Sequence, residues 1–583
     1  MKAAGTAVKV TGKAAVGTAK LIIPNGDDED DKKEKPEKNL TIKMNEFLHN
    51  SVFGIRCAAV QINPTVGALE ANAEKIIAGA KDAAGAGAQL IVFPELALCG
   101  YPPEDLILRP HFIQDCDRQI ARLEKNLPPE VYSVVGAPFA DGSGRYNAAV
   151  VFHGGRIAGV YRKMALPNYG VFDEKRVFDA GDRAFTFAAF GKKIGIHICE
   201  DSWDVNGAAV TALSAEEPDV VINLSASPYH RGKRSEREAV FSAAARKLGA
   251  PLLFCNLVGG QDELVFDGGS AAFAADGSLI AHAPLFEEFI LSTAAPEIRR
   301  DFSAPLEEVY EALKLGLRDY VEKNGFKKTV VAVSGGIDSA LVLTLAADAL
   351  GADRVVAVTM PSQFSSDETV SDAGRIAKNL GVEFHTVPVF PVYEQFTGSL
   401  AAVWHETTPD LTEENLQARI RGTMIMALSN KFGWLVLTTG NKSETATGYC
   451  TLYGDMAGGL AVIKDVPKTL VFELCRWRNS RGAVIPPSTI DRPPSAELRA
   501  DQKDSDSLPA YEILDPVIEA YVEKDMSVDA MIAAGFDEAV VKKVVRLVDR
   551  SEYKRRQSPP GIRITPKAFG RDRRMPVTNR YCG

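Results

Sequence analysis

Cysteine is scarce in this chain, which has eight among 583 residues, and no two of them form a CxxC pair. This usage argues against a disulfide framework and a cysteine-rich zinc site, and it favours a reducing, cytoplasmic location. The chain also lacks an apolar run of the roughly 18 residues that a membrane-spanning helix needs. It has no excess of positive charge either. The net charge of −9 argues against general nucleic-acid binding, so neither nucleic acid nor a membrane is an expected partner.

The remaining composition is typical of soluble globular protein, with 46% hydrophobic and 25% charged residues. A length of 583 residues is too great for one core and predicts at least two domains. Residues 1–45 stand apart, because a Lys-, Ala- and Gly-rich stretch is followed there by a charged low-complexity run. We predict a disordered extension in preference to a targeting peptide, since the apolar core of a secretory signal is absent. The fold is expected to begin near Phe53. It should divide into residues 46–295 and 296–583, with a polar linker near 290–303.

A strand, a Gly-rich turn and a helix follow one another in the second half of the chain. Thr329–Val333 is a β-branched run that predicts a buried strand, and Ala340–Leu350 predicts an apolar helix. Between them lies the sequence SGGIDS, whose glycines let the backbone approach an anion and whose serines add hydroxyl donors. The turn is neither GxGxxG nor a Walker loop, because it contains no Lys. An ordinary strand-to-helix turn is the plain alternative.

The SGGxDS pattern resembles the loop of the ATP pyrophosphatases, which cleave ATP to AMP and pyrophosphate. Further strands and helices alternate after it and predict a doubly wound parallel sheet of Rossmann-like type. One later strand ends in a second motif, TGNKSE. Asp338 and Glu444 are then carboxylates at adjacent strand ends, which suits Mg²⁺, while Lys442 is expected to neutralise phosphate charge. The implied ATP-binding residues are Ser334, Gly335, Gly336, Ile337, Asp338, Ser339, Thr439 and Lys442.

Three predicted strands in the first half end in residues that together can cleave an amide. Ala88–Phe93 leads to Glu95, Arg156–Tyr161 leads to Lys163, and Lys193–Ile198 leads to Cys199. A thiolate is the nucleophile, a carboxylate can take the thiol proton, and an ammonium can lower the thiol pKa and stabilise the oxyanion. Each residue also has a plain reading: a buried small cysteine, a turn glutamate and a solvated lysine.

The segments around these residues, including YRKMALPNYGVFDEKRVF and ICEDSW, resemble the nitrilase superfamily. That resemblance implies an αββα sandwich and the catalytic roles for Glu95, Lys163 and Cys199. Its glutamine-hydrolysing branch implies that Tyr169, Ser227 and Lys233 bind glutamine. An ammonium at Lys233 suits an α-carboxylate, although Ser227 can also simply start a turn.

The order SGGIDS, TGNKSE and YGDMAGGLAVIKDVPKT resembles the NAD synthetase family, and fusion to a nitrilase-type domain resembles its glutamine-dependent members. The resemblance implies a ligase that amidates deamido-NAD through an adenylate, uses ATP and Mg²⁺, and takes ammonia from glutamine. It also implies a homo-oligomer, with an octamer as one candidate. The implied deamido-NAD-binding residues are Asn415, Glu444, Asp465, Lys468 and Lys554.

Two rival functions remain open at this point. One is another amidotransferase of the ATP-pyrophosphatase type, such as a GMP or asparagine synthetase. The other is a binding protein built on a degenerate nitrilase scaffold.

Two segments carry further expectations. Residues 485–506 are expected to form a mobile loop over the synthetase site, and the basic tail after Lys554 is expected to meet the anionic dinucleotide or a neighbouring subunit.

Overall fold

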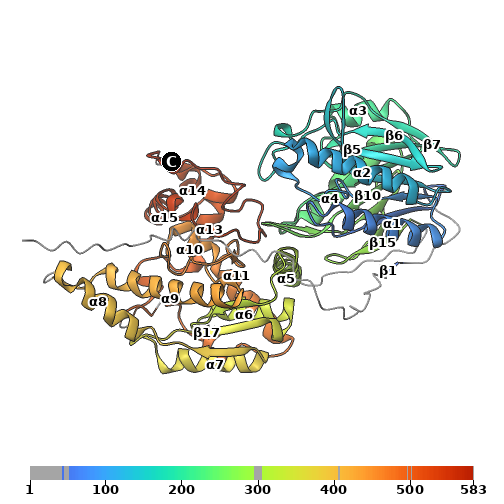
Figure 1. Cartoon of the computed structure of the whole chain (residues 1–583). Helices are drawn as coiled ribbons and strands as arrows, with labels where there is room; N and C mark the ends of the chain where they lie inside the picture. Colours follow the sequence, from blue (N-terminus) through green and yellow to red (C-terminus); the bar gives the residue numbers. More distant parts are fainter. Residues whose placement is uncertain are drawn as a thin grey trace, which may run out of the picture.

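The computed structural model describes residues 43–44, 52–293, 305–404, 407–495, 497–499 and 502–581, the first pair by its backbone alone. Two bodies lie side by side, with the long helix α5 (Pro305–Lys323) at their junction (Figure 1). Most of the predicted disordered extension and residues 294–303 of the predicted linker lie outside the described residues. The linker was predicted to start near residue 290, which is too early, because the buried strand β15 runs to Ser292. The predicted boundary at residue 45 is too late, because Lys43–Met44 forms strand β1 and pairs in parallel with β15 (Phe289–Ser292).

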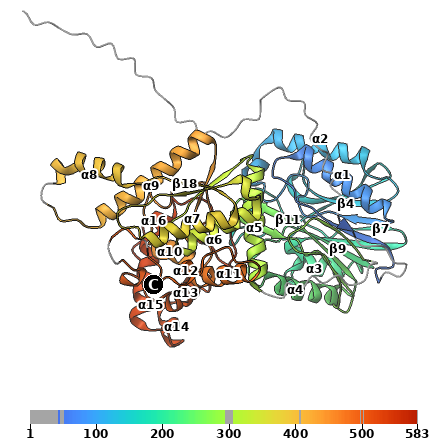
Figure 2. The ribbon, with the colours of Figure 1, turned by 90° about the horizontal axis from the view of Figure 1, so that it is seen from below.

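The N-terminal body is the predicted αββα sandwich. One sheet has seven strands in the order β1-β15-β2-β3-β4-β5-β6 and the other has six in the order β14-β13-β10-β9-β8-β7. Helices α1 and α2 cover the first sheet, and α3 and α4 cover the second (Figures 1 and 2). The remaining elements are β2 (Cys57–Gln61), α1 (Leu69–Gly85), β3 (Leu90–Val92), α2 (Pro110–Asn126), β4 (Tyr132–Asp141), β5 (Gly144–His153), β6 (Arg156–Arg162), β7 (Thr186–Ala189), β8 (Lys192–Ile198), α3 (Ala208–Ser214), β9 (Val220–Ser225), α4 (Lys233–Leu248), β10 (Leu252–Asn256), β13 (Ala271–Phe273) and β14 (Leu279–His282).

The three strands that carry the expected nucleophile, base and cation come from both layers of the sandwich. Strands β3 and β6 belong to the seven-stranded sheet, with β4 and β5 between them, whereas β8 belongs to the six-stranded sheet. Strand β6 is an antiparallel edge strand and β3 is paired in parallel. The strand ends therefore meet across the sandwich and not along one parallel sheet edge.

The C-terminal body contains a five-stranded sheet of parallel pairs in the order β18-β17-β16-β19-β20, which confirms the doubly wound prediction. Alternating residues of β16 serve both faces: Val331 packs with α5 and α6, whereas Val330 packs with α9. Its elements are β16 (Thr329–Ala332), α6 (Ile337–Leu350), β17 (Val355–Thr359), α7 (Asp367–Leu380), β18 (Glu383–Thr386), α8 (Phe390–Trp404), α9 (Leu411–Phe432), β19 (Leu435–Thr438), α10 (Lys442–Thr447), β20 (Leu460–Ala461), α11 (Lys468–Ser480) and α12 (Pro487–Asp491).

A small helical lobe follows and brings the end of the chain back to the first body. It consists of α13 (Tyr511–Ile518), α14 (Val528–Ala533), α15 (Glu538–Arg550) and α16 (Glu552–Arg555) around a core of its own. A two-stranded hairpin of the first body, β11 (Val258–Gln261) and β12 (Leu264–Asp267), packs against α5 at the junction (Figure 2). In the described part of the chain, no helix combines the length and the apolar character needed to cross a bilayer.

The basic tail was expected to meet a dinucleotide or another subunit, but within the chain it meets the first body. The Arg571 guanidinium lies 2.7 Å from the Glu104 carboxylate, and Arg574 donates to the carbonyl of Gly170. The backbone N–H of Arg231 donates to the carbonyl of Ile564 over 2.9 Å. These contacts give the positive charge of the tail acidic and carbonyl partners in the neighbouring body.

Candidate functional site

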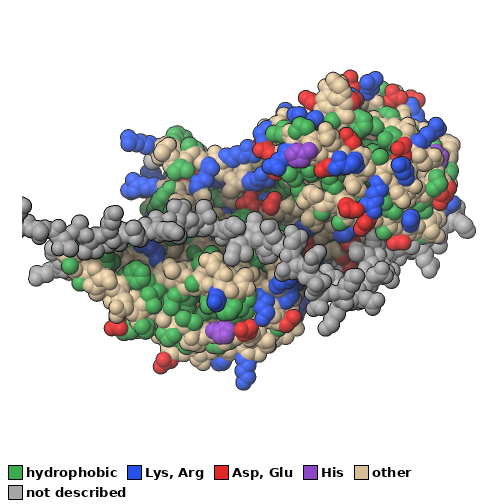
Figure 3. Space-filling model, in the orientation of Figure 1, with side chains coloured by type: hydrophobic (Ala, Val, Ile, Leu, Met, Phe, Trp, Pro, Cys, Tyr) green, Lys and Arg blue, Asp and Glu red, His purple; other side chains and the backbone are tan. Residues whose placement is uncertain are grey.

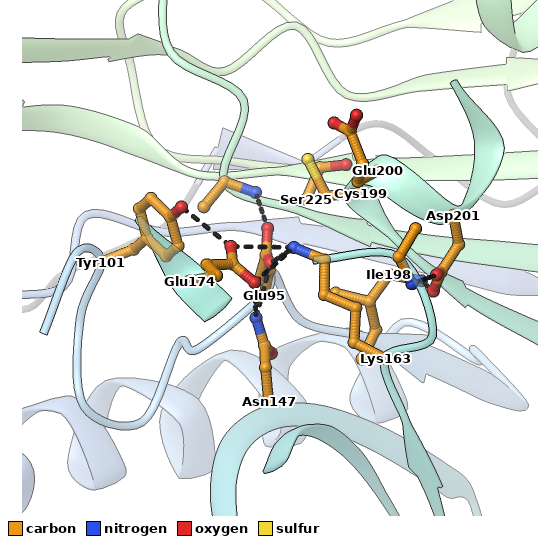
Figure 4. A network of polar contacts seen from close by, with 12 residues as sticks. Glu95, Tyr101, Asn147, Lys163, Glu174, Ile198, Cys199, Glu200, Asp201 and Ser225 are labelled. Carbon is orange, nitrogen blue, oxygen red and sulfur yellow. Dashed lines mark hydrogen bonds and ion pairs between the residues drawn. The ribbon is translucent and has the colours of Figure 1, made fainter. Parts of the chain in front are cut away.

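The structure brings Glu95, Lys163 and Cys199 together at the interface between the two sheets (Figure 4). Glu95 follows β3, Lys163 follows β6, and Cys199 begins a single 3-10 turn directly after β8. All three side chains are nearly inaccessible to solvent. The carboxylate, the ammonium and the thiol thus lie together in one solvent-inaccessible site, as the sequence predicted.

Lys163 is the centre of this cluster and is only 1% exposed. Its Nζ donates to Glu95 Oε1 over 2.7 Å and to both carboxylate oxygens of Glu174 over 2.9 Å. The other oxygen of Glu95 accepts the backbone N–H of Ala226 over 2.8 Å, and Asn147 donates to Glu95 Oε1 over 2.7 Å. The base and the cation are therefore both held in fixed positions before any substrate arrives.

Cys199 has a backbone φ of 41°, a left-handed value that costs a non-glycine residue about 1–3 kcal/mol. Burial raises the pKa of its thiol well above the ordinary value, and the charge of Glu95 raises it further, while Lys163 lowers it. Lys163 thus lowers the thiol pKa as expected, but burial and the charge of Glu95 outweigh its effect in the free protein. A thiol that stays protonated needs a base beside it, and Glu95 provides one.

Two supporting carboxylates in this site were missed at the sequence level. Glu174 receives the Tyr101 hydroxyl over 2.9 Å in addition to Lys163, and burial raises its pKa. Asp201 accepts the Tyr161 hydroxyl over 2.8 Å and the backbone N–H of Ile198 over 2.9 Å, which fixes the turn that carries the nucleophile. Both residues lie in the segments that resemble nitrilases, and that resemblance was the available signal.

The three residues expected to bind glutamine differ in exposure. Tyr169 is 56% exposed, and its hydroxyl donates to Glu200, the neighbour of Cys199, over 2.9 Å. Lys233 opens α4, lies 3.8 Å from the centre of the Trp203 ring, and has its pKa lowered mainly by burial.

Ser227 is buried beside Asn256, whose side-chain oxygen accepts the Ser227 N–H over 2.9 Å. Ser227 is thus held by its backbone near the Glu95 partner Ala226.

A cavity of about 330 Å³ lies at the carboxyl ends of the strands in the second body. The SGGIDS turn, β17, α9 and the segment after α12 line it. Among the residues implied for ATP, all but Gly335 and Lys442 line the cavity. The ones that do are Ser334, Gly336, Ile337, Asp338, Ser339 and Thr439.

The SGGIDS turn is braced from within. The Ser334 N–H donates to Ser339 Oγ over 3.2 Å, and Ser339 Oγ donates to the Gly336 carbonyl over 3.0 Å. Gly335 has φ of 87°, and a Cβ there would overlap the carbonyl of Thr369 on α7. Helix α6 begins at Ile337, three residues before the predicted Ala340, so its N-terminus faces the cavity directly.

Asp338 and Glu444 flank one buried ammonium at the cavity wall. The Lys468 Nζ pairs with Asp338 Oδ2 and lies 3.6 Å from Glu444 Oε1. Asn441 Nδ2 also donates to Asp338 over 2.9 Å. Burial and the charge of Asp338 raise the pKa of Glu444. Carboxylate oxygens are hard ligands, and two of them already converge on a positive charge here. This arrangement suits a divalent cation that is held partly by the phosphates of a substrate. In the described residues, no group of three or more His, Cys, Asp or Glu side chains converges as a metal site.

Lys442 was expected to neutralise phosphate charge, but its ammonium points away from the cavity. It is 1% exposed and lies 2.9 Å from Asp465 Oδ1, 2.7 Å from Glu523 Oε1 and 2.6 Å from Thr565 Oγ1. Asp465, expected to bind deamido-NAD, also accepts the backbone N–H groups of Ile564 and Thr565. Lys442 and Asp465 form a buried ion pair that anchors the end of the chain, and neither residue lines the cavity.

The other residues implied for deamido-NAD divide in the same way. Glu444 and Lys468 line the cavity, whereas Asn415 and Lys554 do not. Asn415 Oδ1 accepts the Thr451 hydroxyl over 2.8 Å, and Lys554 Nζ donates to the carbonyl of Cys450 over 2.7 Å. Both residues therefore contact the segment that follows α10.

Described residues of the segment 485–506 line the synthetase cavity, where this segment was predicted to lie. It is not wholly a loop, because Pro487–Asp491 forms α12. Charged cavity-lining residues beyond the binding residues implied above come partly from this segment and partly from α9, α16 and the loop before α11. They are Arg421, Asp455, Lys464, Arg492, Glu497, Asp504 and Arg555.

Comparison with known proteins links each body to a family. The family described as "Carbon-nitrogen hydrolase" matches residues 56–299, and the family described as "NAD synthase" matches residues 309–558. A glutamine-dependent NAD(+) synthetase of Synechocystis sp. is 44% identical over 551 residues, which covers 90% of this chain and 98% of the relative. A protein of the same name from Acinetobacter baylyi is 47% identical over 535 residues, with the same coverage.

Solved structures agree with these matches. The glutamine-dependent NAD+ synthetase of Acinetobacter baumannii, in complex with adenosine diphosphate, superposes with a TM-score of 0.73 at 44% identity, covering 90% of this chain and 98% of that one. A glutamine-dependent NAD(+) synthetase from Cytophaga hutchinsonii has a TM-score of 0.76 and the same coverage at 23% identity, so it supports the fold alone.

Proposed function

The chain belongs to the family of glutamine-dependent NAD(+) synthetases, and from that premise we propose how its residues divide the reaction. It is a ligase that joins nitrogen from glutamine to deamido-NAD. The first body releases ammonia from glutamine, and the second uses it with ATP. The observation that carries the residue assignment is the Lys163 ammonium, buried between Glu95 and Glu174 beside Cys199.

In the first body, Cys199 Sγ attacks the side-chain amide carbon of glutamine while Glu95 takes the thiol proton. The oxyanion that forms is stabilised by the Lys163 ammonium, which cannot move because two carboxylates hold it. Glu95 returns its proton to the departing nitrogen, so ammonia leaves and a glutamyl thioester remains. Water then hydrolyses the thioester to glutamate. Tyr169, Ser227 and Lys233 are proposed to hold the amino-acid end of glutamine.

In the second body, the nicotinate carboxylate of deamido-NAD attacks the α-phosphorus of ATP. The bond to the β-phosphate oxygen breaks, pyrophosphate leaves, and the acyl adenylate remains. Ammonia attacks the acyl carbon, loses a proton and displaces AMP. The SGGIDS turn and the α6 N-terminus are placed to hold the phosphates. The Acinetobacter baumannii relative was solved in complex with adenosine diphosphate, which supports the use of an adenine nucleotide by this chain.

Mg²⁺ is proposed to be held by Asp338 and Glu444, where it would supply positive charge to the phosphate oxygens. In the protein itself, these two carboxylates face the cavity, and the Lys468 ammonium offsets the repulsion between them.

A homo-oligomer is also proposed, and helix α8 supports it, because none of its residues is buried in the single chain. Its apolar side chains include Phe396, which is 48% exposed, and hydrophobic side chains gather over this part of the surface (Figure 3). A cytoplasmic location stays a prediction from cysteine usage.

A nucleophile variant tests the division of labour. Cys199→Ala should abolish NAD formation from glutamine and leave NAD formation from added ammonium chloride within about twofold of the parent, because the thiol belongs to the first reaction only. Both rates are measured by chromatography of NAD and AMP. Loss of both activities in a folded variant would contradict the assignment.

A further inference from the structure

Arg492 lies directly after α12, in the segment that covers the synthetase cavity, and it lines that cavity. Its side chain is 20% exposed. One guanidinium nitrogen, Nη1, lies 3.4 Å from the carbonyl oxygen of Gly335, inside the SGGIDS turn. The positive charge of Arg492 therefore lies against the turn that is proposed to hold the phosphates.

The other edge of this guanidinium is tied to a buried carboxylate. Arg492 Nη2 donates to Asp372 Oδ2 over 2.7 Å, and Asp372 has no exposed side-chain area. Burial alone would raise the pKa of Asp372. Hydrogen bonds from Arg375, Arg492 and Ser488 outweigh it and lower that pKa, so the carboxylate remains charged. One edge of Arg492 is thus anchored on α7, while the opposite edge is directed at the turn.

The other cations that line the described cavity wall have different partners. Lys468 is engaged by Asp338 and Glu444. The remaining three donate to groups outside the turn: Lys464 to the Pro559 carbonyl, Arg421 to the Met360 carbonyl and Arg555 to Glu552. Among the described cations of this wall, Lys468 pairs with the Asp338 side chain of the SGGIDS turn, whereas Arg492 contacts the turn at its backbone, through the Gly335 carbonyl.

We propose that Arg492 is a catalytic residue that donates to the β- and γ-phosphate oxygens of ATP as pyrophosphate leaves. This rests on the proposed adenylation step. When the bond from the α-phosphorus to the bridging oxygen breaks, its electron pair stays on that oxygen and negative charge grows on the departing pyrophosphate. A guanidinium offers paired N–H donors that match phosphate oxygens, and its anchor on Asp372 keeps it in place as the charge develops.

The test uses the full chain with ammonium chloride as nitrogen donor, so that the first body does not contribute. Arg492→Gln should lower kcat for NAD and AMP formation by about 10²–10³-fold, as expected when one donor to a developing charge is removed. Inorganic pyrophosphate, added as an inhibitor, should bind about tenfold more weakly to this variant. Arg492→Lys keeps the charge but loses the paired donors, and it should give intermediate values for both quantities.

Arg375→Gln is the matched control. Arg375 also pairs with Asp372, and it donates to Ser488 over 2.7 Å, but it does not line the cavity. It should keep kcat and pyrophosphate inhibition within about twofold of the parent.

Equal losses in the Arg375 and Arg492 variants, or unchanged pyrophosphate inhibition in Arg492→Gln and Arg492→Lys, would overturn the proposal and leave Arg492 a structural role only. Release of ADP and phosphate by the parent enzyme is a separate result, since it would overturn the adenylation step itself.

Discussion

Replacing Gly335 by alanine tests whether the SGGIDS turn is the phosphate site. Two effects act at this position. Its φ of 87° is unfavourable for alanine by about 1–2 kcal/mol, and the added Cβ would overlap the Thr369 carbonyl oxygen and lie 2.8 Å from the Thr369 carbonyl carbon. The overlap involves backbone atoms of α7, so the turn has to move by on the order of 1 Å. A displacement of that size costs about 10²-fold in rate when the displaced groups position a reactant.

Gly381→Ala separates these two effects. Gly381 ends α7 with φ of 70°, and a Cβ there would meet nothing within 4 Å. It should therefore share the conformational penalty, which lowers the melting temperature of the second body by about 2–4 °C per kcal/mol, and keep NAD formation within about twofold. Gly335→Ala should lower kcat/KM for ATP about 100-fold in the ammonia-driven assay. A folded Gly335→Ala enzyme with the parent kcat/KM for ATP would refute the phosphate role of the turn.

Two further outcomes follow from the buried charges. Lys442→Met removes the ammonium between Asp465 and Glu523, so it should destabilise the second body by about 3–5 kcal/mol in thermal unfolding. The KM for ATP of the folded variant should not rise. A stable variant with a raised KM for ATP would restore the predicted role of Lys442 in phosphate binding. Because burial raises the pKa of Cys199, its thiolate appears only at high pH. The rate at which iodoacetamide inactivates the glutamine-driven activity should therefore keep rising above about pH 8.5, which is the ordinary pKa of a free thiol. Cys199→Ala is the control for mass spectrometry of the modified residue. A plateau of the rate below that pH would contradict the effect of burial on the thiol pKa.

The sequence was sufficient for the fold class and for the residues at strand ends, because strand periodicity and Gly-rich turns are local signals. Glu95, Lys163 and Cys199 follow strands, and the structure brings them together. The start of α6 was misplaced because Gly, Ser and Asp favour turns, although an acidic residue such as Asp338 also favours the first turn of a helix.

The sequence pattern did not predict the direction in which each side chain points. Lys442 opens α10 within a motif that resembles a nucleotide site, and Asn441 caps the same helix toward Glu444. The Lys442 ammonium nevertheless points into the protein interior, because it donates to Glu523 and Thr565, which lie 81 and 123 residues later in the chain. Glu174 was missed for the same reason, since its bond to Lys163 depends on the path of an irregular loop.

In the described part of the chain, three lysines are at most 2% exposed, and each lies between two carboxylates: Lys163, Lys442 and Lys468. Removing an ammonium from water costs several kcal/mol, which one carboxylate offsets, while the second, when it is ionised, leaves the cluster with excess negative charge. Burial opposes that charge by raising the pKa of Glu174 and of Glu444. What faces that excess decides the use of the cluster. Beside Lys442, the Thr565 hydroxyl and the backbone N–H groups of Ile564 and Thr565 donate to Asp465 and balance that charge, so the cluster is structural. Beside Lys163, burial raises the pKa of the Cys199 thiol and the charge of Glu95 raises it further, so the thiol stays protonated until a base acts. Beside Lys468, the carboxylates face the cavity, where their negative charge is open to a divalent cation.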